Sequence, residues 1–498
     1  MNKNNFFYTS LFIVLVNIIT MLMDFYYNIM LSKFIGPEGI GLFQMATSIL
    51  MVALVFSIGG IPTAVSKLVA EEKFKNNSSY INKILNVAII LVFSILGLII
   101  VFLLIWRQTI TLKIFKDENM IIYIYLLIPA IILISIGSVL RGYYYGLKMI
   151  KIPSVSQILE CISKIFIVLL IFYYIHPVEP KYGVIIALAG ISIGEGFNFF
   201  YLLIMKGKTK SKYFNNVHNP GSLNILSQIS SIAIPIGISN LLAVLLRFAN
   251  TLLIPKKLME IGFSNTDAIA TFGRIMGMAM PLITLPFMIT SAMGIVIVPN
   301  LSKEMAMKNY TMVKSQILFS IKITLLFSIP LAGLYAFFPK SVALFLYNDL
   351  KLSEYICIMS CNTIFLSLQN ALSNILYGLN KQTNATINKL IGASFQIFAI
   401  YFLVGNPRFG INGLFIGFYL SSLIICILNF YTLINMMKLN INYKDLFLKP
   451  IIGSIFMVFP IKFFLKLEFN MGYKTIFLLV LLLGCGIYLL TLYILKAI

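Results

Sequence analysis

The sequence has little charge. Of its 498 residues, 11% are Asp, Glu, Lys or Arg and 60% are hydrophobic, with a mean hydropathy of +0.96. Soluble domains carry about 25% charged residues, because polar groups must cover a surface that faces water. The composition therefore excludes a water-soluble fold and predicts a membrane protein.

Groups that carry enzymatic chemistry are also scarce. The sequence has no Gly-x4-Gly-Lys-Ser/Thr motif, so nucleotide hydrolysis at a phosphate-binding loop is not expected. His176 and His218 lie in expected loops without nearby ligands, and no nucleophile stands beside a base. The five cysteines fall in apolar segments, where packing is expected rather than metal binding. We expect a protein that is not an enzyme and has no cofactor.

What the sequence does contain is a long series of apolar runs. Crossing about 30 Å of hydrocarbon takes roughly 20 residues of helix, whereas a barrel strand is about ten residues of alternating polarity. The runs match the helical length and do not alternate, and further runs carry single charges. They predict an all-α polytopic membrane protein with about 14 transmembrane helices. The clearest uncharged runs are 39–66, 84–106, 119–140, 355–380, 410–437 and 475–495.

Lysine and arginine outnumber the acids by 38 to 16, and they gather in alternate loops. The run Lys206, Lys208, Lys210 and Lys212 is the densest example. The positive-inside rule places these loops and both termini in the cytoplasm. The excess positive charge is expected to attract anionic membrane lipids rather than nucleic acid.

Short motifs recur about 230 residues apart, which indicates an internal duplication. Tyr145-Gly146-Leu147 returns as Tyr377-Gly378-Leu379, an offset of 232 residues, and Asn198-Phe199 returns as Asn429-Phe430, an offset of 231. Six helices separate each pair, so the halves should share one orientation, with substrate bound between them and alternating access by rocking. The predicted parts are an N-terminal six-helix bundle at 1–205, a basic linker at 206–224, a second six-helix bundle at 225–437 and two added helices at 438–498.

Polar residues inside the spans are the candidate site, because a charge in hydrocarbon is costly unless it is paired or hydrated. Asn17, Asp24 and Asn28 share one face of the first helix. The matching helix of the second half carries Asn240 and Arg247. An Asp and an Arg in corresponding places predict a ligand site or a gating ion pair, with a static structural pair as the alternative.

Other charged residues add to this list. Glu160 and Lys164 can pair at i,i+4 in the fifth helix, and this pair could be substrate-binding or simply self-neutralised. Arg274 begins a helix broken by prolines and glycines, and its guanidinium suits diphosphate oxygens, with snorkelling to the interface as the alternative. Asp24 and Glu195 are candidates for coupling to Na⁺ or H⁺, and the membrane potential is the third driving force considered.

Three motifs resemble the stage V sporulation protein B family: IGPEGIGLFQM at 35–45, GGIPTAVSKLVAE at 59–71 and RGYYYGL at 141–147. That family stands with polysaccharide exporters and MurJ-type lipid II flippases in the multidrug/oligosaccharidyl-lipid/polysaccharide (MOP) exporter superfamily. The resemblance implies twelve helices in two repeats plus a terminal pair. It also implies a flippase for an undecaprenyl-diphosphate-linked sugar, in peptidoglycan, spore cortex or polysaccharide synthesis. The implied partners are the lipid-linked glycan, membrane lipids and cell-wall synthesis enzymes.

The resemblance bears on two arginines. Arg274 falls where lipid II flippases carry an eighth-helix arginine, which implies contact with a diphosphate. Those flippases also carry first-helix arginines, which this chain lacks; it has Asp24 there, and Arg247 could supply the charge instead. The alternative is a cation-coupled multidrug antiporter of the same superfamily, and a membrane scaffold or wall-assembly enzyme is a third class.

Overall fold

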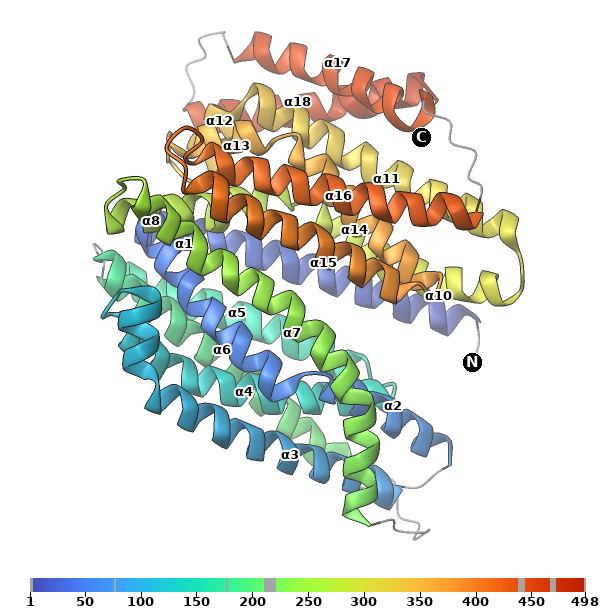
Figure 1. Ribbon diagram of the computed structural model, residues 1–498. Coiled ribbons are helices and arrows are strands. Elements are labelled where there is room, and N and C mark those ends of the chain that lie inside the picture. Colours follow the sequence, from blue (N-terminus) through green and yellow to red (C-terminus); the bar gives the residue numbers. More distant parts are fainter. Residues whose placement is uncertain are drawn as a thin grey trace. The chain divides into compact units, whose positions relative to one another are not determined.

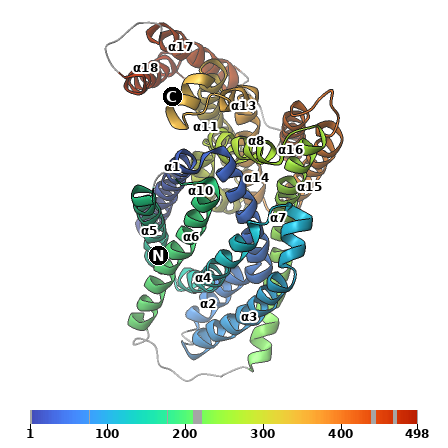
Figure 2. The ribbon, with the colours of Figure 1, turned by 90° about the vertical axis from the view of Figure 1, so that its left-hand side faces the viewer.

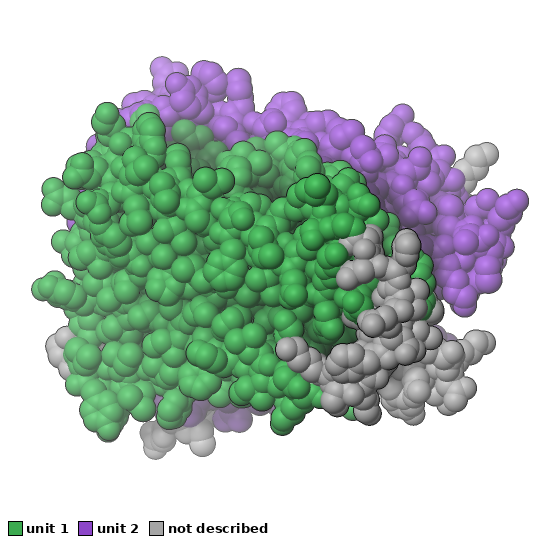
Figure 3. Space-filling model, turned by 90° about the horizontal axis from the view of Figure 1, so that it is seen from below, with its two compact units in different colours: residues 1–256 green, residues 257–498 purple. Residues whose placement is uncertain are grey.

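The computed structural model describes residues 3–75, 78–175, 178–209, 221–437, 444–465 and 472–496. Every regular element in these ranges is a helix. The chain divides into two compact units, residues 1–256 (unit 1) and 257–498 (unit 2), coloured separately in Figure 3. His176, His218 and most of the expected basic linker lie outside the described residues.

Unit 1 holds the first seven α-helices and one π-helix. Most of its last helix, α7, belongs to this unit, although the duplication assigns that segment to the second half. The elements are α1 (Lys3–Ile58), α2 (Ile61–Phe74), α3 (Ser78–Ile105), η1 (Thr109–Phe115), α4 (Met120–Gly146), α5 (Lys151–Ile175), α6 (Pro180–Thr209) and α7 (Ser222–Glu260).

Unit 2 holds the remaining helices, several of them short segments of broken spans. Its elements are α8 (Asn265–Phe272), η2 (Gly273–Ala279), α9 (Met280–Ile283), α10 (Phe287–Ala306), α11 (Tyr310–Phe337), α12 (Pro339–Leu346), α13 (Leu352–Met359), α14 (Asn362–Gly378), α15 (Gln382–Ala399), η3 (Ile400–Val404), α16 (Asn412–Met437), η4 (Lys444–Leu448), α17 (Lys449–Phe464) and α18 (Tyr473–Ile494).

The number of candidate membrane spans is close to the number that the sequence predicts. Eleven described helices are long and apolar enough to cross a membrane, or up to 13 if two bent pairs each count as one span. The 56 residues of α1 extend for about 84 Å at 1.5 Å per residue, far more than one crossing. This helix breaks at Gly36, and Figure 1 shows its two arms running in opposite directions. Counting the arms separately gives fourteen spans, so the expected polytopic helical fold is confirmed.

The turn at Gly36 explains why a glycine stands there. Its φ of 67° lies in the left-handed region, which a residue with a Cβ adopts only with strain. Pro37 follows at the first position of the second arm, where its missing N–H costs no hydrogen bond. The Gly-Pro pair therefore ends one span and starts the next within two residues.

The duplicated Tyr-Gly-Leu motif makes the same contact in each unit. At the end of α4, a Cβ on Gly146 would lie 2.7 Å from the Ser66 carbonyl oxygen of α2. At the end of α14, a Cβ on Gly378 would lie 3.1 Å from the Val298 carbonyl oxygen of α10, and Ser302 Oγ donates to the Gly378 oxygen at 2.8 Å. Both glycines allow close helix packing, so the sequence repeat is also a repeat of structure.

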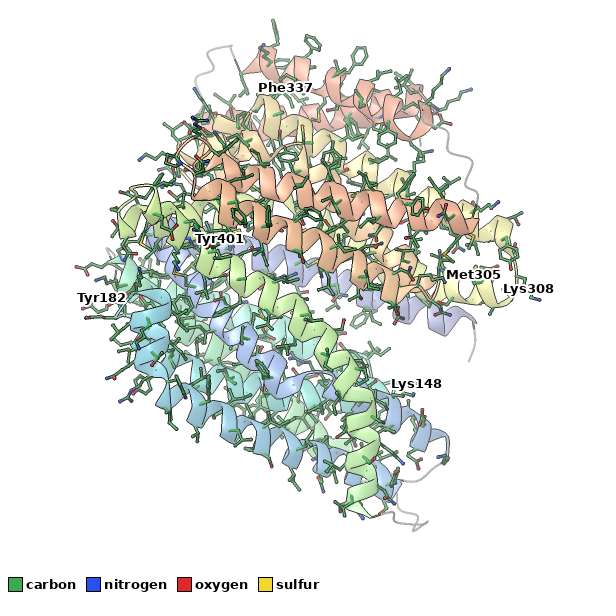
Figure 4. The ribbon with its side chains drawn as sticks, viewed as in Figure 1. Lys148, Tyr182, Met305, Lys308, Phe337 and Tyr401 are labelled. Atoms are coloured by element: carbon green, nitrogen blue, oxygen red, sulfur yellow. The ribbon has the colours of Figure 1, made fainter. Side chains whose placement is uncertain are left out.

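The ends of the unit 1 helices carry residues typical of membrane interfaces. Lys148 follows the end of α4, and Tyr182 lies at the opposite end of the unit (Figure 4). Tyr173, at the same end as Tyr182, is 82% exposed. Exposed tyrosines near the ends of membrane helices match the aromatic belts that mark membrane interfaces.

Candidate functional site

Four helices of unit 1 bring charged side chains together inside the membrane spans. Helices α5 and α6 lie side by side, and α4 lies against α6 (Figures 1 and 2). A Cβ on Gly194 of α6 would lie 3.0 Å from the backbone carbonyl oxygen of Glu160 and 3.0 Å from the Cβ atom of Lys164, both in α5. The absence of a side chain at Gly194 therefore lets α6 approach the charged face of α5.

The first ion pair joins α1 to α5. Lys164 Nζ lies 2.7 Å from Asp24 Oδ1, and it also stands over the ring of Tyr27, 5.0 Å from the centroid. The lysine side chain is 13% exposed and the aspartate 57%. Ion pairing and a cation–π contact together hold the ammonium group at a depth where it would be costly alone.

A second cluster lies one turn away. Arg141 Nη1 of α4 is 3.7 Å from Glu160 Oε2, and Asn198 Nδ2 of α6 donates to Glu160 Oε2 at 3.2 Å. The same amide nitrogen donates to Glu195 Oε2 at 2.9 Å. Glu195 is 6% exposed and Asn198 is fully buried, so this cluster lies inside the helix bundle.

The two clusters do not balance in charge. Asp24, Glu160 and Glu195 supply three carboxyl groups, whereas Lys164 and Arg141 supply two cations. Burying an unpaired carboxylate is strongly unfavourable, so one of these carboxyl groups needs a proton or a bound cation. No group of three metal-ligating side chains is present in the described residues.

Unit 2 also holds an ion-paired, largely buried cation, Arg274. It lies in the π-helix η2, and its Nε donates to Asp349 Oδ2 at 2.6 Å, both side chains being about 15% exposed (16% and 15%). The span that contains it bends by 53° between Ile283 and Phe287. The arginine is thus fixed to the loop before α13, next to a broken helix of the kind that builds transporter sites.

Neutral polar groups link four helices of unit 2. Asn370 Nδ2 of α14 donates to Thr290 Oγ1 of α10 at 2.7 Å. Asn388 Nδ2 of α15 donates to Asn429 Oδ1 of α16 at 2.9 Å, and Asn429 Nδ2 donates to Ser373 Oγ of α14 at 3.2 Å. These amides and hydroxyls are suited to sugar hydroxyls, but in this structure they bond chiefly to one another.

Residues 8–304 match a family model described as polysaccharide biosynthesis protein. This chain belongs to that family. Stage V sporulation protein B of Bacillus subtilis (strain 168) is 25% identical to this polysaccharide biosynthesis family member over 452 residues, covering 89% of this chain and 86% of that protein. The expected family resemblance is confirmed.

Solved structures show the fold of this family member. A structure titled lipid II flippase MurJ, inward closed conformation, has a TM-score of 0.74 and 17% identity, and covers 97% of this chain and 98% of that one. An inward-facing MATE family multidrug resistance transporter of the MOP superfamily has a TM-score of 0.69 and 15% identity, covering 84% and 95%. The chain is a multi-pass membrane protein with the fold of these two transporters.

The residues expected at the site are only partly brought together. Glu160 and Lys164 lie within one network, but each pairs with another helix instead of with its i,i+4 neighbour. Arg247 lies in unit 1 on α7, exposed and without an ion-pair partner in the described residues, and Asp24 pairs with Lys164. Cross-helix pairing prevails because α1 brings a carboxylate to Lys164 and α4 brings a guanidinium group to Glu160.

The remaining expected residues make few polar contacts. Asn240 is exposed on α7, and Asn17 contributes its carbonyl oxygen to Thr20. Asn28 has a buried Oδ1 atom without a hydrogen-bond partner among the described residues. An unpartnered buried acceptor is unfavourable in hydrocarbon, so Asn28 stays a candidate for ligand contact.

Sequence reasoning missed Arg141, Asn198 and Asp349 as site residues. Arg141 lies just past the end of the uncharged run 119–140, where a charge resembles a helix boundary. Asn198 stands out in the sequence only as a landmark of the duplication. The available signal was Arg141 itself, because an arginine within the last two turns of a membrane helix needs a partner at that depth.

Removing Asp24 should destabilise unit 1, because it leaves the Lys164 ammonium group unpaired within a span. We expect Asp24→Ala to lower the free energy of unfolding by about 1 kcal/mol, a modest value because the carboxylate is half exposed. The apparent Tm of the purified protein in detergent measures this. The double variant Asp24→Ala/Lys164→Ala should recover most of the loss, and no recovery would contradict a pairwise contact.

Proposed function

We propose that the chain is an alternating-access flippase that moves an undecaprenyl-diphosphate-linked sugar across the bacterial cytoplasmic membrane. The translocated lipid-linked sugar would serve peptidoglycan, spore cortex or polysaccharide synthesis. The family description, polysaccharide biosynthesis protein, supports a glycan substrate. The name of the relative, stage V sporulation protein B, favours a setting in wall or cortex assembly.

The observation that carries this proposal is the set of cations held inside the spans. Arg274 pairs with Asp349 in unit 2, and Lys164 and Arg141 pair with carboxylates in unit 1. A diphosphate is a multivalent anion, and guanidinium groups bind its oxygens through paired hydrogen bonds. In the proposal these cations exchange their carboxylate partners for the diphosphate. Arg247 needs no such exchange, because no described carboxylate pairs with it.

The rest of the substrate needs other contacts. We assign the sugar to amides and hydroxyls, with Asn17, Asn28 and Asn240 as candidates. The lipid tail is assigned to the surface beside α17 and α18, where Leu482 and Leu490 of α18 are more than 60% exposed (63% and 61%). Membrane lipids and wall-synthesis enzymes are the proposed partners.

Orientation and repeat boundaries form part of the proposal. Lys148 and Lys151 lie at the turn between α4 and α5, where the positive-inside rule favours the cytoplasm. With fourteen spans, both termini then lie in the cytoplasm. The proposed repeats are 1–205 and 225–437, joined by 206–224 and followed by the helix pair at 438–498.

Labelled lipid II translocation in proteoliposomes tests the proposal. We expect the wild-type protein to move lipid II and Arg247→Ala to slow it by about tenfold, the effect of losing roughly 1.4 kcal/mol of charge-assisted binding. Lys256→Ala, which removes an exposed cation near the end of the same helix, is the matched control and should leave the rate unchanged. No translocation by folded wild-type protein would contradict lipid II as the substrate.

The excess carboxyl group in unit 1 favours a second candidate, a cation-coupled multidrug antiporter. In that case Asp24 or Glu195 would bind Na⁺ or H⁺ and exchange it for an organic cation. Efflux of a cationic dye from vesicles with an imposed proton or sodium gradient separates the two candidates. Dye efflux that Asp24→Asn abolishes, without lipid movement, would support the antiporter.

A further inference from the structure

We propose that Arg141 is the diphosphate-binding residue of unit 1, and that a proton on the Glu160–Glu195 pair releases it for that role. This inference rests on the proposed flippase function and assigns both a binding residue and its regulation. Arg141 has five N–H donors, and its contacts in the described residues are Ser138 Oγ at 3.0 Å and Glu160 Oε2 at 3.7 Å. Most of its donors are therefore available to another anion.

The internal duplication provides a neutral counterpart of this cluster. The offset of 232 residues that relates Tyr145 to Tyr377 also relates Arg141 to Ser373. In unit 2 the corresponding helices α14, α15 and α16 are joined through Ser373, Asn388 and Asn429.

The fold does not need charge at these positions. Asn198 bonds to Glu160 in unit 1, and Asn429 bonds to Asn388 in unit 2, one helical turn before Gly392, the position that the same offset gives for Glu160. A neutral amide link therefore suffices to join the equivalent helices. Placing Arg141 and Glu160 in hydrocarbon is costly, and helix packing alone gives no reason for it. The charges of unit 1 are therefore assigned to function.

The geometry around Glu160 and Glu195 indicates a shared proton. Both carboxylates accept from the single Nδ2 atom of Asn198, and the two carboxyl groups face each other. Asn198 Oδ1 is buried and has no hydrogen-bond partner among the described residues. Two adjacent carboxylates do not readily ionise together, and a protonated carboxyl group would also bring a donor to this part of the cluster.

The other carboxylate nearby is already paired with a cation, so the Glu160–Glu195 pair is the group whose charge can change. From α1, Asp24 and Tyr27 face the region, but Asp24 is engaged by Lys164. From α5, Cys161 lies beside Asp24 at 4.0 Å, and from α4 Arg141 is the facing cation. With one shared proton the Glu160–Glu195 pair carries a single negative charge, which Arg141 balances. A further proton taken from solution makes the pair neutral, and it ends the hold on Arg141 without creating an unpaired carboxylate.

Binding of lipid II to the full-length protein in nanodiscs at pH 6 and pH 8 tests this switch. The bridging diphosphate of lipid II is a diester and keeps its charge in this range. Wild-type protein should bind about tenfold more tightly at pH 6, because protonation frees one guanidinium. Glu160→Gln should bind equally at both pH values, with the tighter affinity. Arg141→Ala should bind weakly at both.

The chain itself suggests the control for folding. The double variant Arg141→Ser/Glu160→Asn removes the Arg141–Glu160 ion pair and places at 141 the residue that unit 2 carries at 373, so it should keep an apparent Tm near that of the wild type while binding weakly and without pH dependence. Wild-type affinity in Arg141→Ala, or an unchanged pH effect in Glu160→Gln, would overturn this inference and leave the flippase proposal standing. Absence of binding by wild-type protein at both pH values would overturn both.

Discussion

Replacing Arg274 with alanine is expected to slow translocation of the lipid-linked glycan by about ten- to a hundredfold. Hydrogen bonds to charged groups contribute roughly 1.5–3 kcal/mol, and each 1.4 kcal/mol is a factor of ten. Arg274 is fixed in η2 by Asp349 at 2.6 Å, so its guanidinium is held in place before substrate arrives. The rate of labelled lipid II movement in proteoliposomes measures the effect.

Two further variants separate binding from structure at this position. Arg274→Lys keeps the charge but loses the planar pair of donors, so an intermediate rate is expected. Asp349→Asn removes the competing carboxylate but keeps the arginine, and it should translocate at least as fast as the wild type. If Arg274→Ala were as fast as the wild type and Asp349→Asn slower, the ion pair would be a structural contact and not a substrate site.

Replacing Gly142 with valine is expected to prevent unit 1 from folding. A Cβ at this position would lie 2.4 Å from the Pro62 carbonyl oxygen, which is backbone and cannot move aside as a flexible side chain could. Helix α4 would have to separate from α2 along the contact that also includes Gly146. We expect loss of the monodisperse purified protein in size-exclusion chromatography, with little protein reaching the membrane fraction.

Gly97→Val supplies the matched control for that substitution. Gly97 lies in α3 and is exposed, and a Cβ added there would have no described neighbour within 4 Å. Valine at this position adds the same volume inside the same unit, facing outward. A normal yield for both variants would contradict the tight α2–α4 contact.

The sequence predicted the helical architecture well, because the length of an apolar run reports directly on membrane crossing. Stretches outside the clearest apolar runs, such as 382–404 and 449–464, are also helical, as α15 with η3 and as α17. The duplication was visible because Gly146 and Gly378 serve the same packing contact, so neither can change freely. Such local constraints leave a readable pattern in a single chain.

Pairing of charges was less predictable. Helical spacing suggested Glu160 with Lys164, but spacing describes only one helix, whereas α1 brings Asp24 to Lys164 and α4 brings Arg141 to Glu160. Tertiary contacts between helices far apart in sequence decide these pairs. The hold of Asp349 on Arg274 was hidden for the same reason, since 75 residues separate them.

The abrupt turn at Gly36 bears on how the protein is made. Because Gly36 and Pro37 alone separate the two arms of α1, almost no polar chain has to be carried across the bilayer between the first two spans. The nascent chain can therefore enter the membrane as a preformed helical hairpin rather than one helix at a time.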